Sequence, residues 1–195
     1  MKILIDLDDT LIDLLTPWVN YLNQKHGTCV SPSDVTQWDI QQSFPTLTKQ
    51  QVFEPLFDTI LYDDIKTIPD AQRYLESLSK QHTIYIVTNT PMCISKYKLE
   101  KTLYNNFPYI TPQHVIITPH KSNVEGDVLI DDYILNLVDG TYSKILFTRP
   151  HNMLINVSTV NKKIVRCDSW KQIYNQINKL HQEITHDKIV HHALS

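Results

Sequence analysis

The sequence predicts an α/β fold: a three-layer, mostly parallel sheet covered on both faces, with a small helical cap inserted after the first strand. Short β-branched apolar runs alternate with helix-like segments, which is typical of parallel sheets. The 195 residues are 42% hydrophobic, enough to bury a sizeable core. One long stretch, residues 12–68, interrupts the alternation directly after the first strand. We therefore expect a core domain over residues 1–11 and 69–195 and a cap over residues 12–68.

Six short apolar runs are expected to form the sheet. Most have apolar residues at consecutive positions, as in strands that are buried on both faces. The runs are Lys2–Asp6, Thr83–Thr88, His114–Thr118, Asp127–Asp131, Lys144–Thr148 and Lys163–Cys167.

Helices are expected between these runs, where apolar residues recur at helical spacing. The predicted core helices are Asp70–Gln81, Ser95–Asn105, Tyr133–Val138 and Ser169–Ile184, and the predicted cap helices are Asp13–His26 and Thr48–Asp58. The last core helix has Ser169 as its N-cap. The tail beyond Ile184 carries His186, His191 and His192, and we expect a frayed terminus there rather than a metal-binding tract.

The composition excludes several classes of protein. The net charge is −3, without a basic tract, so the sequence gives no sign of a nucleic-acid polymer as partner. With only three glycines there is no glycine-rich phosphate loop or dinucleotide fingerprint. No apolar run reaches the ~20 residues of a membrane span, and no signal peptide precedes the first strand. The three widely spaced cysteines fit a reducing compartment. A cytoplasmic enzyme is the default expectation, and a homodimer is left open.

The first strand ends in a concentration of carboxylates. Asp6, Asp8 and Asp9 follow the apolar run Ile3–Ile5, and Thr10 comes next. Carboxylates at the end of a buried strand repel one another and resist desolvation, so something must offset their charge. A hard divalent cation such as Mg²⁺ does so, because it prefers oxygen ligands.

Further polar residues follow the other predicted strands, and the carboxyl ends of parallel strands share one edge of a sheet. We expect the following residues to meet there: Asp6 and Asp8, Thr88 and Asn89, Lys121, and Asp131 with Asp132. Asp6 can attack phosphorus as a carboxylate nucleophile, and Asp8 can act as general acid and base. Thr88 and Asn89 offer donors to phosphate oxygens, and Lys121 adds a stabilising charge. The carboxylates of Asp6, Asp131 and Asp132 can hold Mg²⁺.

This set of motifs resembles the haloacid dehalogenase superfamily of phosphatases, whose fold is a Rossmann-like sheet with a cap inserted after the first motif. The nucleophile motif matches Asp6–Thr10, the threonine motif Ile84–Thr88, the lysine motif Lys121 and the acidic motif Asp127–Asp132.

Within that superfamily the chain looks like the 5′(3′)-deoxyribonucleotidases. The similar stretches are Thr83–Asp132, Lys144–Asn152, Cys167–Trp170 and, more loosely, Val35–Asp39 of the cap. The resemblance implies hydrolysis of deoxynucleoside monophosphates, with Mg²⁺ held by Asp6, the backbone carbonyl of Asp8 and one of Asp131 and Asp132. Leu14 stands where the mitochondrial enzyme has an aromatic residue, which leaves the pyrimidine preference open.

Two alternative functions keep part of this chemistry. A phosphatase acting on a sugar phosphate or another small phosphomonoester would share the sheet edge and differ only in the cap. A non-catalytic phospho-receiver would also combine acidic residues, a Thr and a Lys, but its phospho-accepting Asp follows the third strand. The segment His114–Lys121 has no Asp, and a receiver lacks a cap of this length.

Several singled-out residues also have structural interpretations. Asp9, Asp13 and Asp127 are expected to be structural, and Trp18 is expected to pack inside the cap. Trp38 has two equally supported interpretations. Its ring could stack on the base of the nucleotide, or it could pack in the core of the cap. Asn152 fits a turn or a role in ordering the site.

Overall fold

Six parallel strands form the sheet, in the order β3-β2-β1-β4-β5-β6. The computed structural model describes the backbone of residues 1–193 and the side chains of residues 1–186. The strands are β1 (Lys2–Ile5), β2 (Thr83–Thr88), β3 (Val115–Ile117), β4 (Val128–Asp131), β5 (Ser143–Phe147) and β6 (Ile164–Cys167). The predicted α/β fold is confirmed, and the chain's first strand lies between β2 and β4 in the middle of the sheet.

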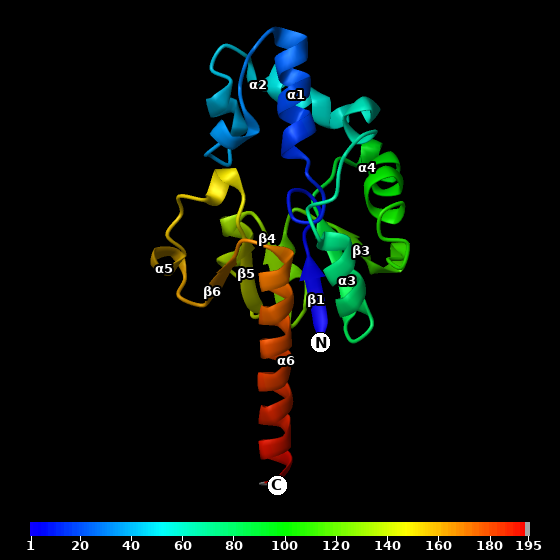
Figure 1. Cartoon of the computed structure of the whole chain (residues 1–195), viewed down its shortest axis with the longest axis vertical. Coiled ribbons are helices and arrows are strands. Elements are labelled where there is room, and N and C mark those ends of the chain that lie inside the picture. Colours follow the sequence, from blue (N-terminus) through cyan, green and yellow to red (C-terminus); the bar gives the residue numbers. More distant parts are fainter. Residues whose placement is uncertain (194–195) are drawn as a thin grey trace.

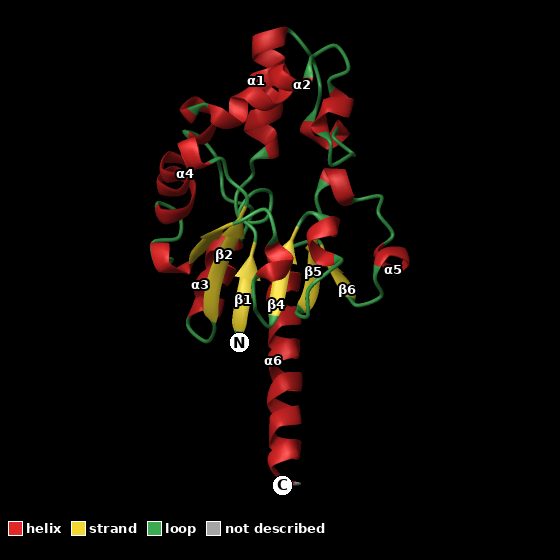
Figure 2. Cartoon of the chain, turned by 180° about the vertical axis from the view of Figure 1, so that it is seen from behind, coloured by secondary structure: helices red, strands yellow, loops and turns green. Residues whose placement is uncertain are grey.

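The two faces of the sheet are covered unequally. Ile3 and Ile5 of β1 face one cluster, which includes residues of α3 (Ala71–Ser79) and α6 (Trp170–Ala193). Leu4 faces the other way, toward a smaller cluster that a short 3₁₀ helix, Ile134–Leu137, covers. In Figure 2 the sheet is seen from this second face, with α3 and α6 behind it. Because both faces are covered, consecutive strand positions are apolar.

Some helices differ from the predicted bounds. The segment Tyr133–Val138 forms only that 3₁₀ turn, and the short α5 (Val157–Val160) was not expected. The helix α4 (Met92–Lys98) starts earlier than predicted and continues as a π-helix over Leu99–Tyr104.

The last helix, α6, runs past the predicted end at Ile184 to Ala193, away from the cap (Figure 1). His186 is exposed, whereas the side chains of His191 and His192 lie outside the described residues. Within the described part of the chain, no helix combines the length and apolarity that crossing a bilayer requires.

Residues 12–68, which we call the cap, lie above the carboxyl edge of the sheet (Figure 1). The cap contains α1 (Leu15–His26), α2 (Lys49–Phe53) and four 3₁₀ turns, at Pro32–Asp34, Ile40–Ser43, Glu54–Phe57 and Thr59–Tyr62. It has its own apolar cluster, which includes Val19, Leu22, Phe44 and Val52. The predicted helix Thr48–Asp58 is thus divided into α2 and a 3₁₀ turn that contains Pro55.

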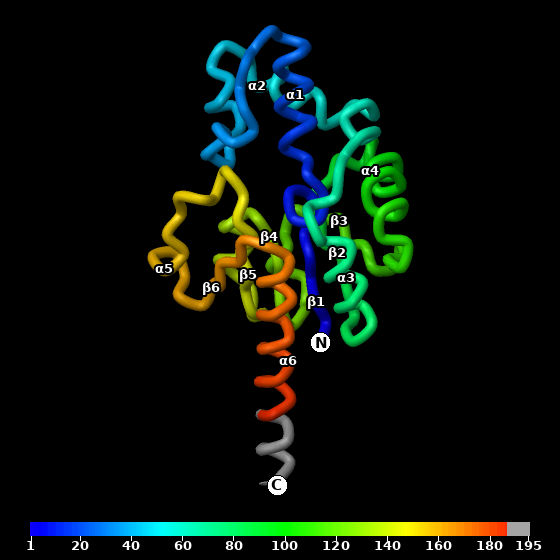
Figure 3. The backbone as a smooth tube through the Cα atoms, in the orientation of Figure 1, coloured from blue at the N-terminus to red at the C-terminus, as the bar shows by residue number. Residues whose placement is uncertain are grey.

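Two chain segments connect the cap to the core and pair with each other. The Asp13 N–H donates to Lys66 O at 2.9 Å, and the Ile68 N–H donates to Leu11 O at 2.8 Å. Figure 3 shows these segments side by side, in blue and in blue-green, between the sheet and the cap. They hold the cap over the edge where the polar residues gather.

Candidate active site

A cavity of about 530 Å³ lies between the cap and the carboxyl edge of the sheet. Its core side is polar, with Asp6, Asp8, Asn89, Lys121 and Asp132. Its cap side is mostly apolar, with Leu14, Leu15, Trp18, Val35, Ile40, Phe53 and Leu56. The predicted meeting of strand ends therefore produces a pocket with a charged floor and a mostly apolar roof, to which Gln37, Asp39 and Lys49 add polar groups.

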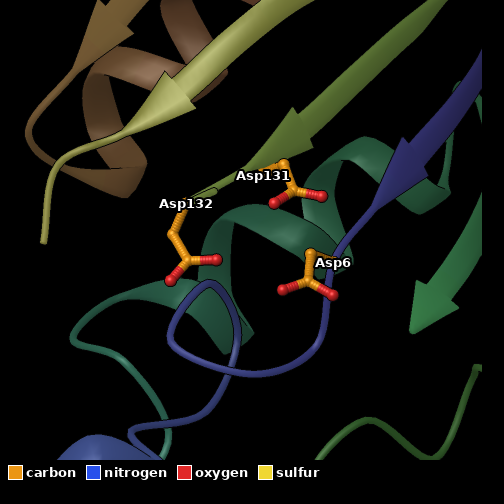
Figure 4. A group of neighbouring side chains, drawn as sticks. All are labelled: Asp6, Asp131 and Asp132. Atoms are coloured by element: carbon orange, nitrogen blue, oxygen red, sulfur yellow. The ribbon is translucent and has the colours of Figure 1, made fainter. Parts of the chain in front are cut away.

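Three buried carboxylates converge on this floor, as Figure 4 shows. Asp6, Asp131 and Asp132 each offer an oxygen, and these oxygens all lie within 4.8 Å of one another. The strand ladder fixes this arrangement, because the Asp6 N–H donates to Ile130 O at 2.9 Å, directly beyond β1. Burial raises the pKa of Asp6 well above its ordinary value, and the neighbouring Asp131, Asp132 and Asp8 raise it further.

Lys121 supplies the counter-charge. Its ammonium lies 2.5 Å from Asp6 Oδ1 and 2.7 Å from Asp131 Oδ2, and its side chain is only 4% exposed. It stands at the start of the short 3₁₀ turn Lys121–Asn123, which follows β3. Burial opposes its charge, but Asp131 and Asp6 hold the pKa of Lys121 above its usual range. Conversely, Lys121 lowers the pKa of Asp6 against the effect of burial.

Asp131 and Asp132 have different surroundings. Both oxygens of Asp131 are occupied: Oδ1 accepts from the Tyr133 N–H and Asn136, and Oδ2 accepts from Lys121 and Asn136. Asp132 lines the cavity and meets His151, with 3.0 Å between its Oδ2 and His151 Nε2. Burial alone would lower the pKa of His151, but the hydrogen bond and charge of Asp132 raise it overall.

Asn152 connects the loop after β5 to the backbone of Asp132 through its side-chain amide. Its side-chain amide donates to Asp132 O at 2.7 Å and to Phe147 O at 2.8 Å, and its carbonyl accepts from Arg166 at 3.0 Å. The structure thus combines the two interpretations of Asn152, since it closes a turn and fixes the backbone of Asp132.

The structure separates Asp8 from the carboxylate cluster. Its Oδ2 lies 2.5 Å from the ammonium of Lys98, a buried residue of α4 that the sequence analysis did not single out. Thr88 is also fully buried, and its hydroxyl lies 3.3 Å from that of Thr90 rather than at the cavity. From this turn it is Asn89 that lines the cavity.

The carboxylates that were expected to be structural are held by contacts with the backbone or with Arg149, although Asp9 also lines the cavity. Asp9, at φ 54°, accepts from the Leu15 N–H, and Arg149 joins it to Asp13 at distances of 3.1 and 2.8 Å. Burial, together with Asp132, raises the pKa of Asp9 to about 7. Asp127 is at the far end of the sheet, where it accepts from the Lys2 N–H at 2.6 Å.

The two tryptophans of the cap also have defined places. Trp18 packs on the cap cluster and donates to Val52 O at 2.7 Å, as expected, although it also lines the cavity. Trp38 is half exposed and stacks on Tyr133 of the core, with ring centroids 3.8 Å apart. It lines the cavity and bridges cap and core, so the interpretation as cap core is wrong.

Comparisons with known sequences identify the family. The family model described as 5′ nucleotidase, deoxy (Pyrimidine), cytosolic type C protein matches residues 1–183. A 5′(3′)-deoxyribonucleotidase of Bacillus subtilis is 34% identical over 178 residues, which cover 90% of this chain and 97% of that protein. One of Clostridium acetobutylicum is 32% identical over 166 residues, covering 85% and 88%.

Solved structures share the fold at low identity. A haloacid dehalogenase family hydrolase from Deinococcus radiodurans, described with bound phosphate and sodium, is 14% identical with a TM-score of 0.62, covering 92% of this chain and 96% of that one. The putative hydrolase YfnB from Bacillus subtilis, described as bound to magnesium, is 14% identical with a TM-score of 0.59, covering 91% and 98%. The match to the family model over nearly the whole chain shows that this protein belongs to the deoxy-5′-nucleotidase family, and it is a phosphomonoester hydrolase with the haloacid dehalogenase-like fold.

Proposed function

We propose that the protein is a Mg²⁺-dependent phosphatase that hydrolyses deoxyribonucleoside monophosphates through an aspartyl-phosphate intermediate. One observation carries the proposal: Asp6, Asp132 and Lys121 line the floor of a cavity whose roof is mostly apolar, and Asp131 lies directly beside them. The floor suits a metal-bound phosphate, and the roof suits a nucleobase.

The residues present fit a hard divalent cation. Three buried carboxylates outnumber the single ammonium that lies between two of them, so a further positive charge would be stabilised. Asp6 and Asp132 would hold the ion with the backbone carbonyl of Asp8, while Asp131, whose oxygens are both occupied, would orient Lys121. When bound, the ion would neutralise phosphate oxygens so that a carboxylate can approach phosphorus.

The chain's own residues then divide the reaction into two steps. An Asp6 oxygen bonds to phosphorus while the ester P–O bond breaks, and the leaving oxygen keeps that electron pair and takes a proton from Asp8. In the second step Asp8 takes a proton from water, whose oxygen bonds to phosphorus as the bond to Asp6 breaks and phosphate leaves. Lys121 supports the first step because its charge lowers the pKa of Asp6 against the effect of burial and so favours the ionised nucleophile.

Asn89 and Lys121 are the proposed donors to the phosphate, since both line the cavity. Thr88 remains a predicted donor, although its hydroxyl would first have to leave Thr90. Trp38 remains the proposed platform for the base, because one face of its ring stacks on Tyr133 while the side chain lines the cavity. The free cysteines Cys29, Cys93 and Cys167 support a reducing, cytoplasmic environment.

A phosphate-release screen tests the substrate class. We expect turnover of deoxyribonucleoside monophosphates with Mg²⁺ and none with excess chelator, and acid quenching should trap a phosphorylated Asp6. If the protein hydrolyses sugar phosphates but none of the deoxynucleotides, the proposed substrate class is wrong. A phosphorylated protein without turnover would instead favour a phospho-receiver.

A further inference from the structure

A buried lysine that the phosphoryl-transfer scheme does not use lies directly beside Asp8. Lys98 is the last residue of α4 and is only 2% exposed. Its ammonium lies 2.5 Å from Asp8 Oδ2 and 3.0 Å from Thr90 Oγ1. A buried ammonium is costly unless it is paired and hydrogen-bonded, so this position requires a reason.

The local backbone is also unusual at this residue. The helix changes from α to π directly after Lys98, over Leu99–Tyr104. Short π segments are rare and frequently occur at functional sites. Thr102 donates its hydroxyl to Lys98 O at 2.8 Å, and the ring of Tyr62 from the cap lies 5.6 Å from the ammonium. Lys98 is thus held from several sides.

The pairing treats the two oxygens of Asp8 differently. Lys98 occupies Oδ2, whereas Oδ1 is buried and has no hydrogen-bond partner among the described residues. An ammonium only donates hydrogen bonds, so Lys98 holds Oδ2 as an acceptor and fixes the orientation of the whole carboxyl group. Asp8 itself lines the cavity.

We infer that Lys98 is a positioning residue that fixes the carboxyl group of Asp8 through Oδ2, so that Asp8 is held at the cavity for proton transfer to the leaving oxygen of the substrate. This inference rests on the proposed phosphatase function. Lys98 would act through Asp8, without contacting the phosphate or the metal itself. Two buried lysines would then have separate tasks, one at each catalytic aspartate. Lys121 serves the nucleophile and Lys98 serves the acid.

The inference predicts a dependence on the leaving group. A deoxynucleotide releases an alkoxide, which needs a proton as the P–O bond breaks. p-Nitrophenyl phosphate releases a phenolate that is stable without one. The ratio kcat/KM reports the steps up to release of the leaving group, so it isolates the contribution of Asp8 as an acid.

The test compares Lys98→Met with Lys96→Met, a matched change at an exposed lysine of the same helix. For Lys98→Met we expect kcat/KM on a deoxynucleotide to fall on the order of 10²-fold. On p-nitrophenyl phosphate it should stay within a few-fold of the unmodified protein, and Lys96→Met should change neither value. Thr90→Val, which keeps both charges and removes the hydroxyl that contacts Lys98 and Thr88, should give a smaller effect of the same kind and serves if Lys98→Met does not fold.

Equal losses on both substrates in the folded variants would overturn the inference, because a purely structural ion pair does not distinguish leaving groups. An unchanged kcat/KM on the deoxynucleotide would overturn it as well. If the unmodified protein hydrolyses neither substrate, the proposed phosphatase function is wrong, and the role of Lys98, which depends on it, is wrong as well.

Discussion

Replacing Lys121 with methionine should expose how strongly the site depends on positive charge. The change removes the ammonium that lies 2.5 Å from Asp6 and 2.7 Å from Asp131 while keeping a side chain of similar length. All three side chains are at most 9% exposed, so solvent compensates little. Removing one partner of a buried ion pair costs about 3–5 kcal/mol. For a chain of this size that corresponds to a fall in Tm of roughly 6–20 °C.

Metal and pH should modulate this loss in defined directions. Lys121 lowers the pKa of Asp6 and of Asp131, so its removal raises both. A carboxyl whose folded pKa is raised binds more protons in the folded state than in the unfolded state, and stability then falls as pH rises. The loss should therefore be small near pH 4 and larger at pH 8. Mg²⁺ should restore more stability to the variant than to the unmodified protein.

The assay is thermal unfolding followed by circular dichroism, in chelator and in Mg²⁺, at both pH values. Lys171→Met, at an exposed lysine of α6, is the control and should stay within about 0.5 kcal/mol. If Lys121→Met and Lys171→Met have the same Tm in chelator at pH 8, the buried ammonium of Lys121 does not stabilise the fold. In kinetic assays the same variant should lose kcat on the order of 10²-fold.

Three further predictions concern other parts of the molecule. Asp6→Asn should abolish phosphate release while leaving the protein folded by circular dichroism, and substantial turnover would exclude Asp6 as nucleophile. Asn152→Ala should lower the free energy of unfolding by about 1–3 kcal/mol, because it removes the buried amide that donates to the carbonyls of Asp132 and Phe147; denaturant titration measures this. Burial and the N-terminal charge lower the pKa of His82, whose ring nitrogens are both buried and have no hydrogen-bond partner among the described residues. The unfolded chain therefore binds the extra proton as pH falls below about 6.5, and stability falls with it. His82→Leu should flatten that pH dependence, and an unchanged slope would contradict this.

The sheet and the strand-end residues were predictable because their signals are local. Each strand is a short run of apolar residues, and parallel strands necessarily bring their carboxyl ends to one edge. Asp6, Lys121 and Asp131 therefore meet as expected, although they come from three distant parts of the chain. The weak helix Tyr133–Val138 had too little apolar periodicity to show that it stops at a 3₁₀ turn.

The partners of these residues were not predictable. Nothing in the helix sequence marks Lys98 as buried, because lysine side chains are almost always solvated unless they are paired, and the partner Asp8 lies far away in the sequence. His151 and Asn136 act through contacts that only the folded loops create. Thr88 illustrates the converse, since its motif was recognisable but the direction of its hydroxyl depends on Thr90.

The central place of β1 has a consequence for the order in which the protein matures on the ribosome. Its neighbours, β2 and β4, begin at Thr83 and Val128, so the first strand to be synthesised waits for partners made much later. The cap, with its own apolar cluster, is translated entirely within that interval and is the first part that can fold. Asp6 is fixed only when β4 arrives with Asp131. A nascent chain therefore contains the complete cap long before Asp6 is held in place as a nucleophile. Chains that terminate before β4 would lack catalytic activity.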